Sequence, residues 1–223
     1  MKEVHSETKD KSFKLDITGL QRGTAYVFTA FASVEGAKGL SFSSPIELET
    51  LEGDQPGDLE IPGYKIVFQD EFDVDGKPAA HWNYEIGQSI RNNEAQYYSD
   101  NIENAYVEGG YLHIVARKDH NGYNYTSSSM TTRDSFTYMY GKLRVRAKIP
   151  VKGGSWPAIW LLGNWWEWPY NGEIDVMEYY RGMILANACW GGTVRWQGVW
   201  DSAAPSITHF TDQDPDWVDK FHV

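Results

Sequence analysis

The sequence has little of several features that mark large protein classes. Cys189 is its only cysteine, so this chain can form neither an intrachain disulfide nor a thiolate metal cluster. Its apolar runs fall short of the about 18 residues that a membrane-spanning helix needs, and no segment keeps a 3.6-residue period. Basic residues are also scarce, with 20 Lys and Arg against 31 Asp and Glu. The resulting net charge of −11 argues against a nucleic-acid partner, because phosphate binding needs clustered cations.

The start of the chain lacks a recognisable targeting signal. Met1–Ser6 contains no apolar core of the kind found in a signal peptide. We therefore expect either a cytosolic protein or a sequence whose true start lies further upstream. The 223 residues are enough for one large all-β domain, alone or with a smaller piece.

Aromatic residues are the most over-represented class in the composition. They make up 15% of the chain and include 10 Trp and 14 Tyr. Aromatic rings stack on the apolar faces of sugars and on nucleic-acid bases. Since the negative charge disfavours nucleic acid, the composition favours a carbohydrate partner.

Residues 12–50 show alternating apolar patterns separated by turn residues, which predicts β-strands. Residues 20–28, Leu-Gln-Arg-Gly-Thr-Ala-Tyr-Val-Phe, resemble the tyrosine corner and following strand of a fibronectin type III domain, and residues 43–50 resemble its last strand. Such a sandwich needs about seven strands. We therefore predict a partial fibronectin type III-like module at 1–51, with an irregular β extension as the alternative, and a linker rich in Gly, Pro and Asp at 52–63.

Residues 64–223 read as a second domain that is also all-β. An apolar strand is predicted at Tyr64–Phe72, a hairpin around Glu108–Gly110, and a polar surface loop at Asn121–Ser129. Tyr140–Pro150 shows the clearest alternation, with apolar side chains on one face and Lys and Arg on the other. The pattern favours two stacked antiparallel sheets.

The most informative stretch is Gly172–Tyr180, which holds three carboxylates within six residues. Alternation in a strand places Glu173 and Asp175 on one face. Glu178 would fall on the other face unless a β-bulge near Met177 takes up one extra residue. With that bulge, three acids line one surface, which is costly unless the surface meets water, a cation or a substrate that needs acid–base chemistry.

The acids alone are a weak signal. Three acids at this spacing arise by chance about 0.6 times in so acidic a chain, and a solvated strand face would explain them. The surrounding aromatic residues favour a functional site. Trp156 and Trp160 are four residues apart and so share a strand face, and an aromatic cluster at residues 165–170 leads into the acids. Together these features predict a sugar cleft with catalytic acids.

Gly153–Tyr180 as a whole resembles glycoside hydrolase family 16. It carries the Gly-x-Trp-Pro-Ala-x-Trp strand and then the bulged form of the Glu-Ile-Asp-x-x-Glu signature, which resembles that of laminarinases, agarases and carrageenases. Asn93–Tyr98, Phe68–Phe72 and Phe221-His222 are similar to further elements of that family. The resemblance covers residues 64–223 and implies a concanavalin A-like jelly-roll β-sandwich with an open groove on its concave face.

The resemblance also implies roles for individual residues. Glu173 would be the nucleophile of a retaining hydrolysis and Glu178 the general acid/base, while Asp175 between them would hydrogen-bond the nucleophile and help set its charge state. Trp156 and Trp160 would be stacking platforms. The further groove candidates are Asn93, Glu94, Arg133 and His222, of which His222 has an equally good structural interpretation.

We expect the substrate to be β-1,3- or mixed β-1,3/1,4-glucan. The alternatives are an agarase-, porphyranase- or carrageenase-type galactan hydrolase, a transglycosylase, and a non-catalytic carbohydrate-binding protein. We expect a monomer without cofactor or bound metal, although the family often holds a structural calcium, and Glu71 and Gly109 lie in the matching segments.

Family members continue some 50 residues past the Phe-His position. The resemblance therefore implies an internal fragment of a longer protein, extracellular, periplasmic or on the cell surface, and we expect this piece to be poorly stable and weakly active or inactive.

Overall fold

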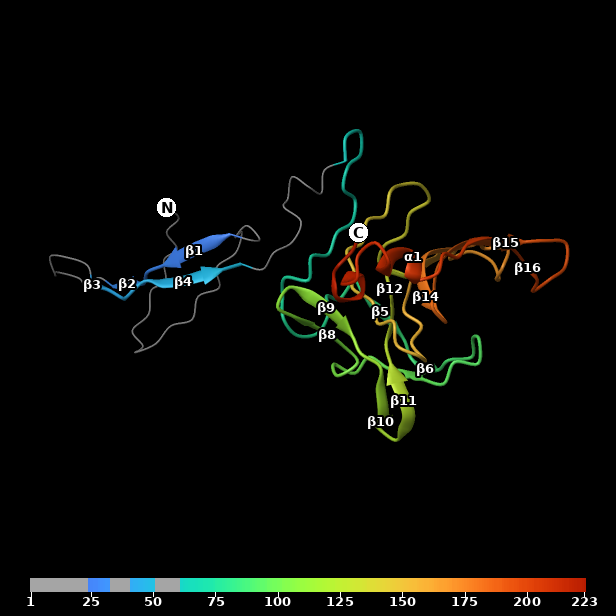
Figure 1. Cartoon of the computed structure of the whole chain (residues 1–223), viewed down its shortest axis with the longest axis horizontal. Helices are drawn as coiled ribbons and strands as arrows, with labels where there is room; N and C mark the ends of the chain where they lie inside the picture. Colours follow the sequence, from blue (N-terminus) through green and yellow to red (C-terminus); the bar gives the residue numbers. More distant parts are fainter. Residues whose placement is uncertain (1–23, 33–40, 51–60) are drawn as a thin grey trace. The chain divides into compact units, whose positions relative to one another are not determined.

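The computed structural model describes residues 24–32, 41–50 and 61–223. The chain divides into two compact units, residues 1–136 and 137–223, which are described separately here. Nearly all regular structure in the described residues is β (Figure 1). The exceptions are the short helix α1 (Thr208–Thr211) and the 3₁₀ turn η2 (Trp217–Asp219). The predicted all-β class is thus confirmed.

The first part of unit 1 is a pair of two-stranded ladders. Strand β1 (Ala25–Phe28) pairs antiparallel with β4 (Ile46–Glu49), and β2 (Phe31–Ala32) pairs with β3 (Ser41–Phe42). The predicted tyrosine corner begins at residues 20–23, and most of the predicted linker falls at 51–60, both outside the described residues. The fibronectin type III-like module and its boundary remain predictions.

The rest of unit 1 consists of short strands in three sheets. One holds β10 (Arg117–His120), β11 (Tyr123–Ser127), β7 (Tyr97–Tyr98) and β6 (Gly87–Gln88), in that order; the other two pair β5 (Asn83–Glu85) with β12 (Ser129–Thr131), and β8 (Ala105–Glu108) with β9 (Tyr111–Ile114). The β8–β9 hairpin confirms the predicted turn. Gly109 and Gly110 have φ of 61° and 80°, as a type I′ turn requires at both central positions.

The surface loop predicted at Asn121–Ser129 is wrong. This segment forms β11 and the start of β12, and β10 and β11 make a hairpin with His120 opposite Tyr123. The turn is Asn121-Gly122, with both residues at positive φ, so an Asn-Gly hairpin signal outweighed the low apolar content. The strand is anchored by a polar contact, since Asn104 Nδ2 donates to the buried Thr126 hydroxyl at 3.0 Å.

Unit 2 is built on one antiparallel sheet. Its strands lie in the order β13 (Ala158–Leu162), β14 (Glu173–Tyr180), β15 (Met183–Gly191) and β16 (Gly198–Ala203). These strands are drawn in orange to red in Figure 1. Each connection is a hairpin, so neighbours in sequence are neighbours in the sheet.

The strands predicted at Tyr64–Phe72 and Tyr140–Pro150 do not form. Within Tyr140–Pro150, only Ala147 makes a ladder contact, an isolated bridge to His222. Leu143 and Val145, predicted to be buried, are 43% and 36% exposed. Alternation describes which face a strand would bury, but a strand also needs a partner for its backbone hydrogen bonds, and among the described residues the ladder pairing along these two segments is limited to the Ala147–His222 bridge.

Candidate active site

The three carboxylates of β14 lie on one face of the unit 2 sheet. Residues directly opposite each other in an antiparallel ladder point to the same side. Glu173 lies between Leu162 and Cys189, and Asp175 lies between Trp160 and Asn187. Asp175 is buried, at 4% exposure, whereas the next residues on the other face, Ile174 and Val176, are exposed.

A β-bulge returns Glu178 to this face. On the β15 side, the register passes from Asp175 opposite Asn187 to Glu178 opposite Leu185, so Val176 and Met177 together oppose one residue. The ladder with β13 is irregular at the same place. This confirms the predicted bulge near Met177, whose extra residue keeps the acids aligned.

Hydrogen bonds join the acids to three neighbouring side chains. Asn187 Nδ2 donates to Asp175 Oδ2 at 2.9 Å and to Glu178 Oε2 at 3.2 Å. Trp168 Nε1 donates to Glu173 Oε2 at 2.6 Å, and Trp156 Nε1 donates to Glu178 Oε1 at 2.9 Å. An indole N–H therefore bonds to each glutamate, Trp168 to Glu173 and Trp156 to Glu178. The Asn187 amide bridges Asp175 and Glu178.

The electrostatics of the row centre on Glu173. Burial raises the pKa of this half-buried carboxyl above its ordinary value, and the neighbouring Asp175 and Glu178 carboxyls raise it further, while the Trp168 N–H opposes the rise. Burial also raises the pKa of the Cys189 thiol opposite Glu173. Glu173 therefore lies beside carboxyls that disfavour its charged form, the usual basis for splitting acid and base roles.

Both predicted tryptophan platforms lie beside the acids. Trp160 is opposite Asp175 in the ladder, which puts its side chain on the acid face. Trp156 precedes β13, contacts Glu178 through its ring nitrogen, and packs against Tyr180 with ring centroids 4.3 Å apart. Its side chain is 36% exposed, which leaves part of the indole open to a ligand.

Comparisons with known proteins identify the family. The model of the XgeA-like, catalytic GH16 domain matches residues 84–188, which include all three acids. LamA of Zobellia galactanivorans, solved in complex with laminaritriose and laminaritetraose, is 32% identical over 70% of each chain, with a TM-score of 0.56. The chain belongs to glycoside hydrolase family 16. The laminarinase catalytic domain of Thermotoga maritima is also similar, at 34% identity and a TM-score of 0.54 over 71% of this chain and 67% of that one.

Relatives in sequence point to the same group of proteins. Glucan endo-1,3-β-glucosidase A1 of Niallia circulans is 33% identical over 190 residues, and the β-glucanase of Rhodothermus marinus is 43% identical over 130 residues. These alignments cover 75% and 54% of this chain, but only 27% and 45% of the two relatives. The family 16 chain thus spans less than half the length of these relatives.

The other predicted groove residues make local contacts. In unit 1, Glu94 Oε2 accepts hydrogen bonds from three side chains, Ser89 at 3.0 Å, Gln96 at 2.6 Å and Tyr98 at 2.7 Å. The backbone of Arg133 accepts from the side-chain amide of Asn83, and Asn93 adopts a positive φ of 54°. A substrate role for Asn93, Glu94 and Arg133 remains a prediction for this family 16 domain.

His222 has a well-defined structural environment in unit 2. Its backbone exchanges two hydrogen bonds with Ala147, its Nε2–H donates to the Trp217 carbonyl at 2.7 Å, and its ring stacks on Trp217 at 4.2 Å. None of these contacts involves the three acids. The structure thus gives His222 a packing role, and a catalytic one remains a prediction.

Trp168 and Asn187 are the site residues that the sequence interpretation did not single out. Trp168 belongs to the aromatic cluster before the acids, but nothing in its spacing distinguishes it from Trp165 or Trp166. Asn187 is a polar residue inside the apolar run Met183–Cys189. A lone polar residue at such a position was the available signal, because buried amides need partners.

Two negative findings apply to the described ranges only. Residues 24–32, 41–50 and 61–223 contain no group of three or more His, Cys, Asp or Glu side chains arranged to hold a metal ion. In the same ranges, no helix is long and apolar enough to span a bilayer.

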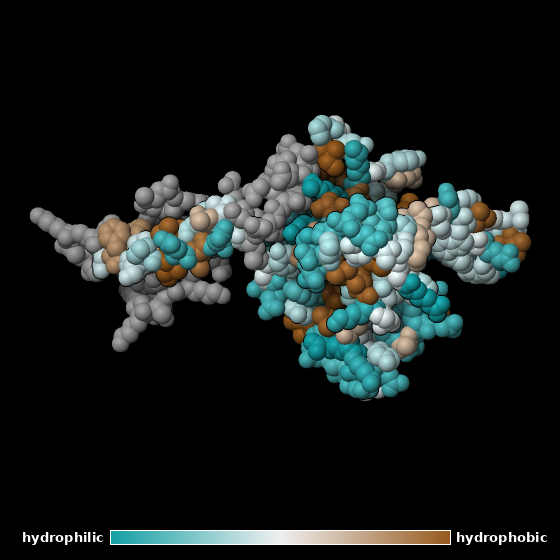
Figure 2. All heavy atoms as spheres, in the orientation of Figure 1, coloured by the Kyte–Doolittle hydropathy of each residue, from teal (hydrophilic) through white to brown (hydrophobic). Residues whose placement is uncertain are grey.

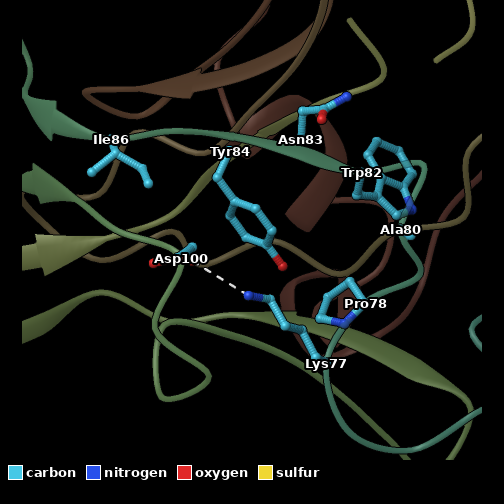
Figure 3. A pocket seen from close by; sticks show the side chains of 8 residues that line it. All are labelled: Lys77, Pro78, Ala80, Trp82, Asn83, Tyr84, Ile86 and Asp100. Atoms are coloured by element: carbon cyan, nitrogen blue, oxygen red, sulfur yellow. Dashed lines mark hydrogen bonds and ion pairs between the residues drawn. The ribbon is translucent and has the colours of Figure 1, made fainter. Parts of the chain in front are cut away.

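Unit 1 also contains a hollow of its own. It is lined by Lys77, Pro78, Ala80, Trp82, Asn83, Tyr84, Ile86 and Asp100. Figure 3 shows Tyr84 between Ile86 and Trp82, with Lys77 paired to Asp100. Burial raises the pKa of the Tyr84 hydroxyl, which has no hydrogen-bond partner among the described residues. The hollow contains a single carboxylate, already paired, and so lacks the two acids that glycoside hydrolysis needs.

Proposed function

We propose that this protein is a retaining endo-glycoside hydrolase that cleaves β-1,3- or mixed β-1,3/1,4-glucan. The observation that carries the proposal is the row of Glu173, Asp175 and Glu178 on one sheet face, with indole N–H groups bonded to its two ends. The named activities of similar proteins support the substrate. They include a glucan endo-1,3-β-glucosidase and an endo-1,3-1,4-β-glycanase, EglC of Rhizobium meliloti, at 35% identity over 118 residues.

In the proposed mechanism, Glu173 attacks the anomeric carbon and Glu178 donates its proton to the departing glycosidic oxygen. The C–O bond to the leaving sugar breaks as the ester to Glu173 forms. Glu178, now a carboxylate, then takes a proton from water, whose oxygen attacks the same carbon and releases Glu173. The assignment of the two roles follows the family resemblance.

The contacts of each carboxyl fit these roles. The Trp168 N–H at 2.6 Å stabilises the anion of Glu173, which must be ionised to attack even though burial raises its pKa. Asp175 sits between the two glutamates and shares the Asn187 amide with Glu178, so it fixes the position of the acid/base. Trp156 and Trp160 would stack on the sugar rings beside these groups.

Two alternatives have an observation in their favour. The β-1,3-glucan-binding protein of Penaeus monodon is 37% identical over 107 residues, which suits a non-catalytic role. The keratan-sulfate endo-1,4-β-galactosidase of Sphingobacterium multivorum is 28% identical over 159 residues, which suits a galactan. The net charge of −11 argues against a sulfated substrate, since sulfate groups would need cations in the groove.

The remaining expectations belong to this proposal. We propose an open groove along the acid face of a jelly-roll sandwich, a monomer, and a location outside the cytoplasm. No cofactor takes part in the proposed chemistry.

The test is reducing-end release from a panel of laminarin, lichenan, agarose, porphyran and carrageenan. We expect laminarin or lichenan to be cleaved, and the Glu173→Gln variant to lose at least about a thousandfold in rate while it still binds the glucan. Near-normal activity of Glu173→Gln would refute the nucleophile. Cleavage of galactans only would refute the substrate, and products longer than the substrate would indicate transglycosylation.

A further inference from the structure

Two loops of unit 2 leave the sheet at the end where Glu173 lies. Residues 163–172 join β13 to β14, and residues 192–197 join β15 to β16. Leu162 is opposite Glu173 at the start of the first loop, and Gly191 is opposite Gly198 at the start of the second. Because the strands are antiparallel neighbours, both loops extend beyond the same end of the sheet, which is the end nearer Glu173 than Glu178.

Side chains fasten the two loops to each other. Arg195 Nε and Nη2 donate to the two carboxylate oxygens of Glu167 at 2.8 and 2.7 Å, a two-point contact that fixes orientation as well as distance. The Tyr170 ring also lies so close to Gly191 that an added Cβ there would overlap its ring atoms. The Arg195–Glu167 pair is solvent-exposed, so its effect is on loop geometry more than on stability.

The joined loops present exposed indoles. Trp165, Trp166 and Trp196 are 81%, 87% and 55% exposed, and the Arg195 guanidinium lies 5.2 Å from the centre of the Trp196 ring. Large aromatic side chains exposed together usually mark a binding surface. The first loop also carries Trp168, whose ring nitrogen bonds to Glu173, so the exposed indoles and the acids share one short segment.

We infer that these two loops form an accessory platform that binds the polysaccharide chain beyond the cleavage site, on the Glu173 side. Trp165, Trp166 and Trp196 stack on sugar rings, and the Arg195–Glu167 pair positions the loops that carry them. The platform suits a neutral glucan, because Glu167 neutralises Arg195 and leaves no free cation in the pair. This inference rests on the proposed function for the identity of the polysaccharide.

The test measures binding separately from catalysis. In the Glu173→Gln background, laminarin affinity is measured by electrophoresis through gels containing the polysaccharide, and laminaribiose affinity by calorimetry. We expect the additional changes Trp165→Ala and Trp166→Ala to weaken laminarin binding at least about tenfold. If the platform binds only sugars beyond those held at the acids, the affinity of the two-sugar ligand laminaribiose should change by less than about twofold.

Trp190→Ala is the matched control. Trp190 is 47% exposed but lies on the opposite sheet face, since its neighbour Cys189 is the residue that faces Glu173. Its replacement should leave laminarin affinity unchanged. Circular dichroism of each variant checks that the sheet is intact.

A charge swap tests the positioning pair. Arg195→Glu alone should weaken laminarin binding, and combining it with Glu167→Arg should restore most of the affinity, because the two-point contact re-forms with its ends exchanged.

Unchanged laminarin affinity in the folded Trp165→Ala/Trp166→Ala variant would overturn the platform. Cleavage of galactans but not of laminarin or lichenan by the unsubstituted chain would instead overturn the proposed function, and the binding comparison would still decide whether the platform exists.

Discussion

At the scale of single residues, the surroundings of Glu173 act on its pKa in opposite directions. Burial and the Asp175 and Glu178 carboxyls favour its protonated form, and the Trp168 N–H favours its anion. Such a balance is expected of a group that must change its charge state or bond order during a reaction. It also predicts a dependence of stability on pH.

The Glu173→Gln variant should be more stable than the unsubstituted chain at neutral pH. A carboxyl whose pKa is raised in the folded state stabilises the fold while protonated, and this contribution is lost as the pH rises through the folded-state pKa. Glutamine stays neutral, so the advantage should grow with pH from the range of the ordinary glutamate pKa upward. Urea unfolding from pH 4 to pH 8 measures it, and an advantage that is independent of pH would contradict this explanation.

Glu94 offers a contrasting prediction, because its contacts are structural. Glu94→Ala removes the acceptor shared by Ser89, Gln96 and Tyr98 and should cost about 1–3 kcal/mol of unfolding free energy. Burial, followed by the Glu94 carboxylate, raises the pKa of Tyr98 to about 12, so its hydroxyl remains a donor at neutral pH. Unchanged stability together with a raised KM for glucan would favour the predicted groove role instead.

The sequence allowed the acids and the flanking tryptophans to be located, because strand alternation and one bulge determine their face. It did not reveal Trp168 and Asn187, since their importance depends on register between strands that are apart in sequence. The three local donors to Glu94 were likewise not predictable from the sequence, and its groove role remains a prediction.

At the scale of elements, the bulge in β14 determines whether the active site exists. Deleting Met177 would restore plain alternation with Glu178 on the acid face, whereas inserting a glycine after Val176 with the present bulge retained would turn Glu178 to the other face. We expect the deletion variant to hydrolyse laminarin at least about tenfold faster than the insertion variant. Equal rates in two folded variants would show that the bulge does not align the acids.

Strands and hairpins were predictable from the sequence where the residues that determine them lie next to one another in the chain. The β8–β9 hairpin follows from two adjacent glycines, and β14 from its alternation. The strand expected at Tyr140–Pro150 failed because pairing is a long-range property, and its alternating residues have only the Ala147–His222 bridge. The β10–β11 hairpin was not predicted because its Asn121-Gly122 turn lies in a polar stretch of low apolar content.

At the scale of the whole molecule, exposed apolar surface is prominent. The sheet face opposite the acids exposes Ile174, Val176, Trp190 and Val199 by 51%, 40%, 47% and 42%. Figure 2 shows further hydrophobic side chains, in brown, among the hydrophilic surface. An uncovered apolar sheet face stabilises a domain less than a buried one does.

We therefore expect the 223-residue chain to bind a hydrophobic dye and to unfold over a broad temperature range. Differential scanning calorimetry and dye fluorescence measure these properties. A sharp, cooperative transition without dye binding would contradict the expectation of poor stability. Activity is best measured at about 10–20 °C, where domains are usually most stable.

The most direct test of the central claim is azide rescue of the two glutamate variants. With an aryl β-glycoside that needs no acid catalysis, azide can replace the missing nucleophile in Glu173→Ala and attack the face that this residue leaves open, which gives an α-glycosyl azide. In Glu178→Ala, azide should attack the intermediate held by Glu173 and give the β-azide. We predict opposite anomers from the two variants by NMR; the same anomer from both, or no rescue of Glu173→Ala, would contradict the roles assigned to the two glutamates.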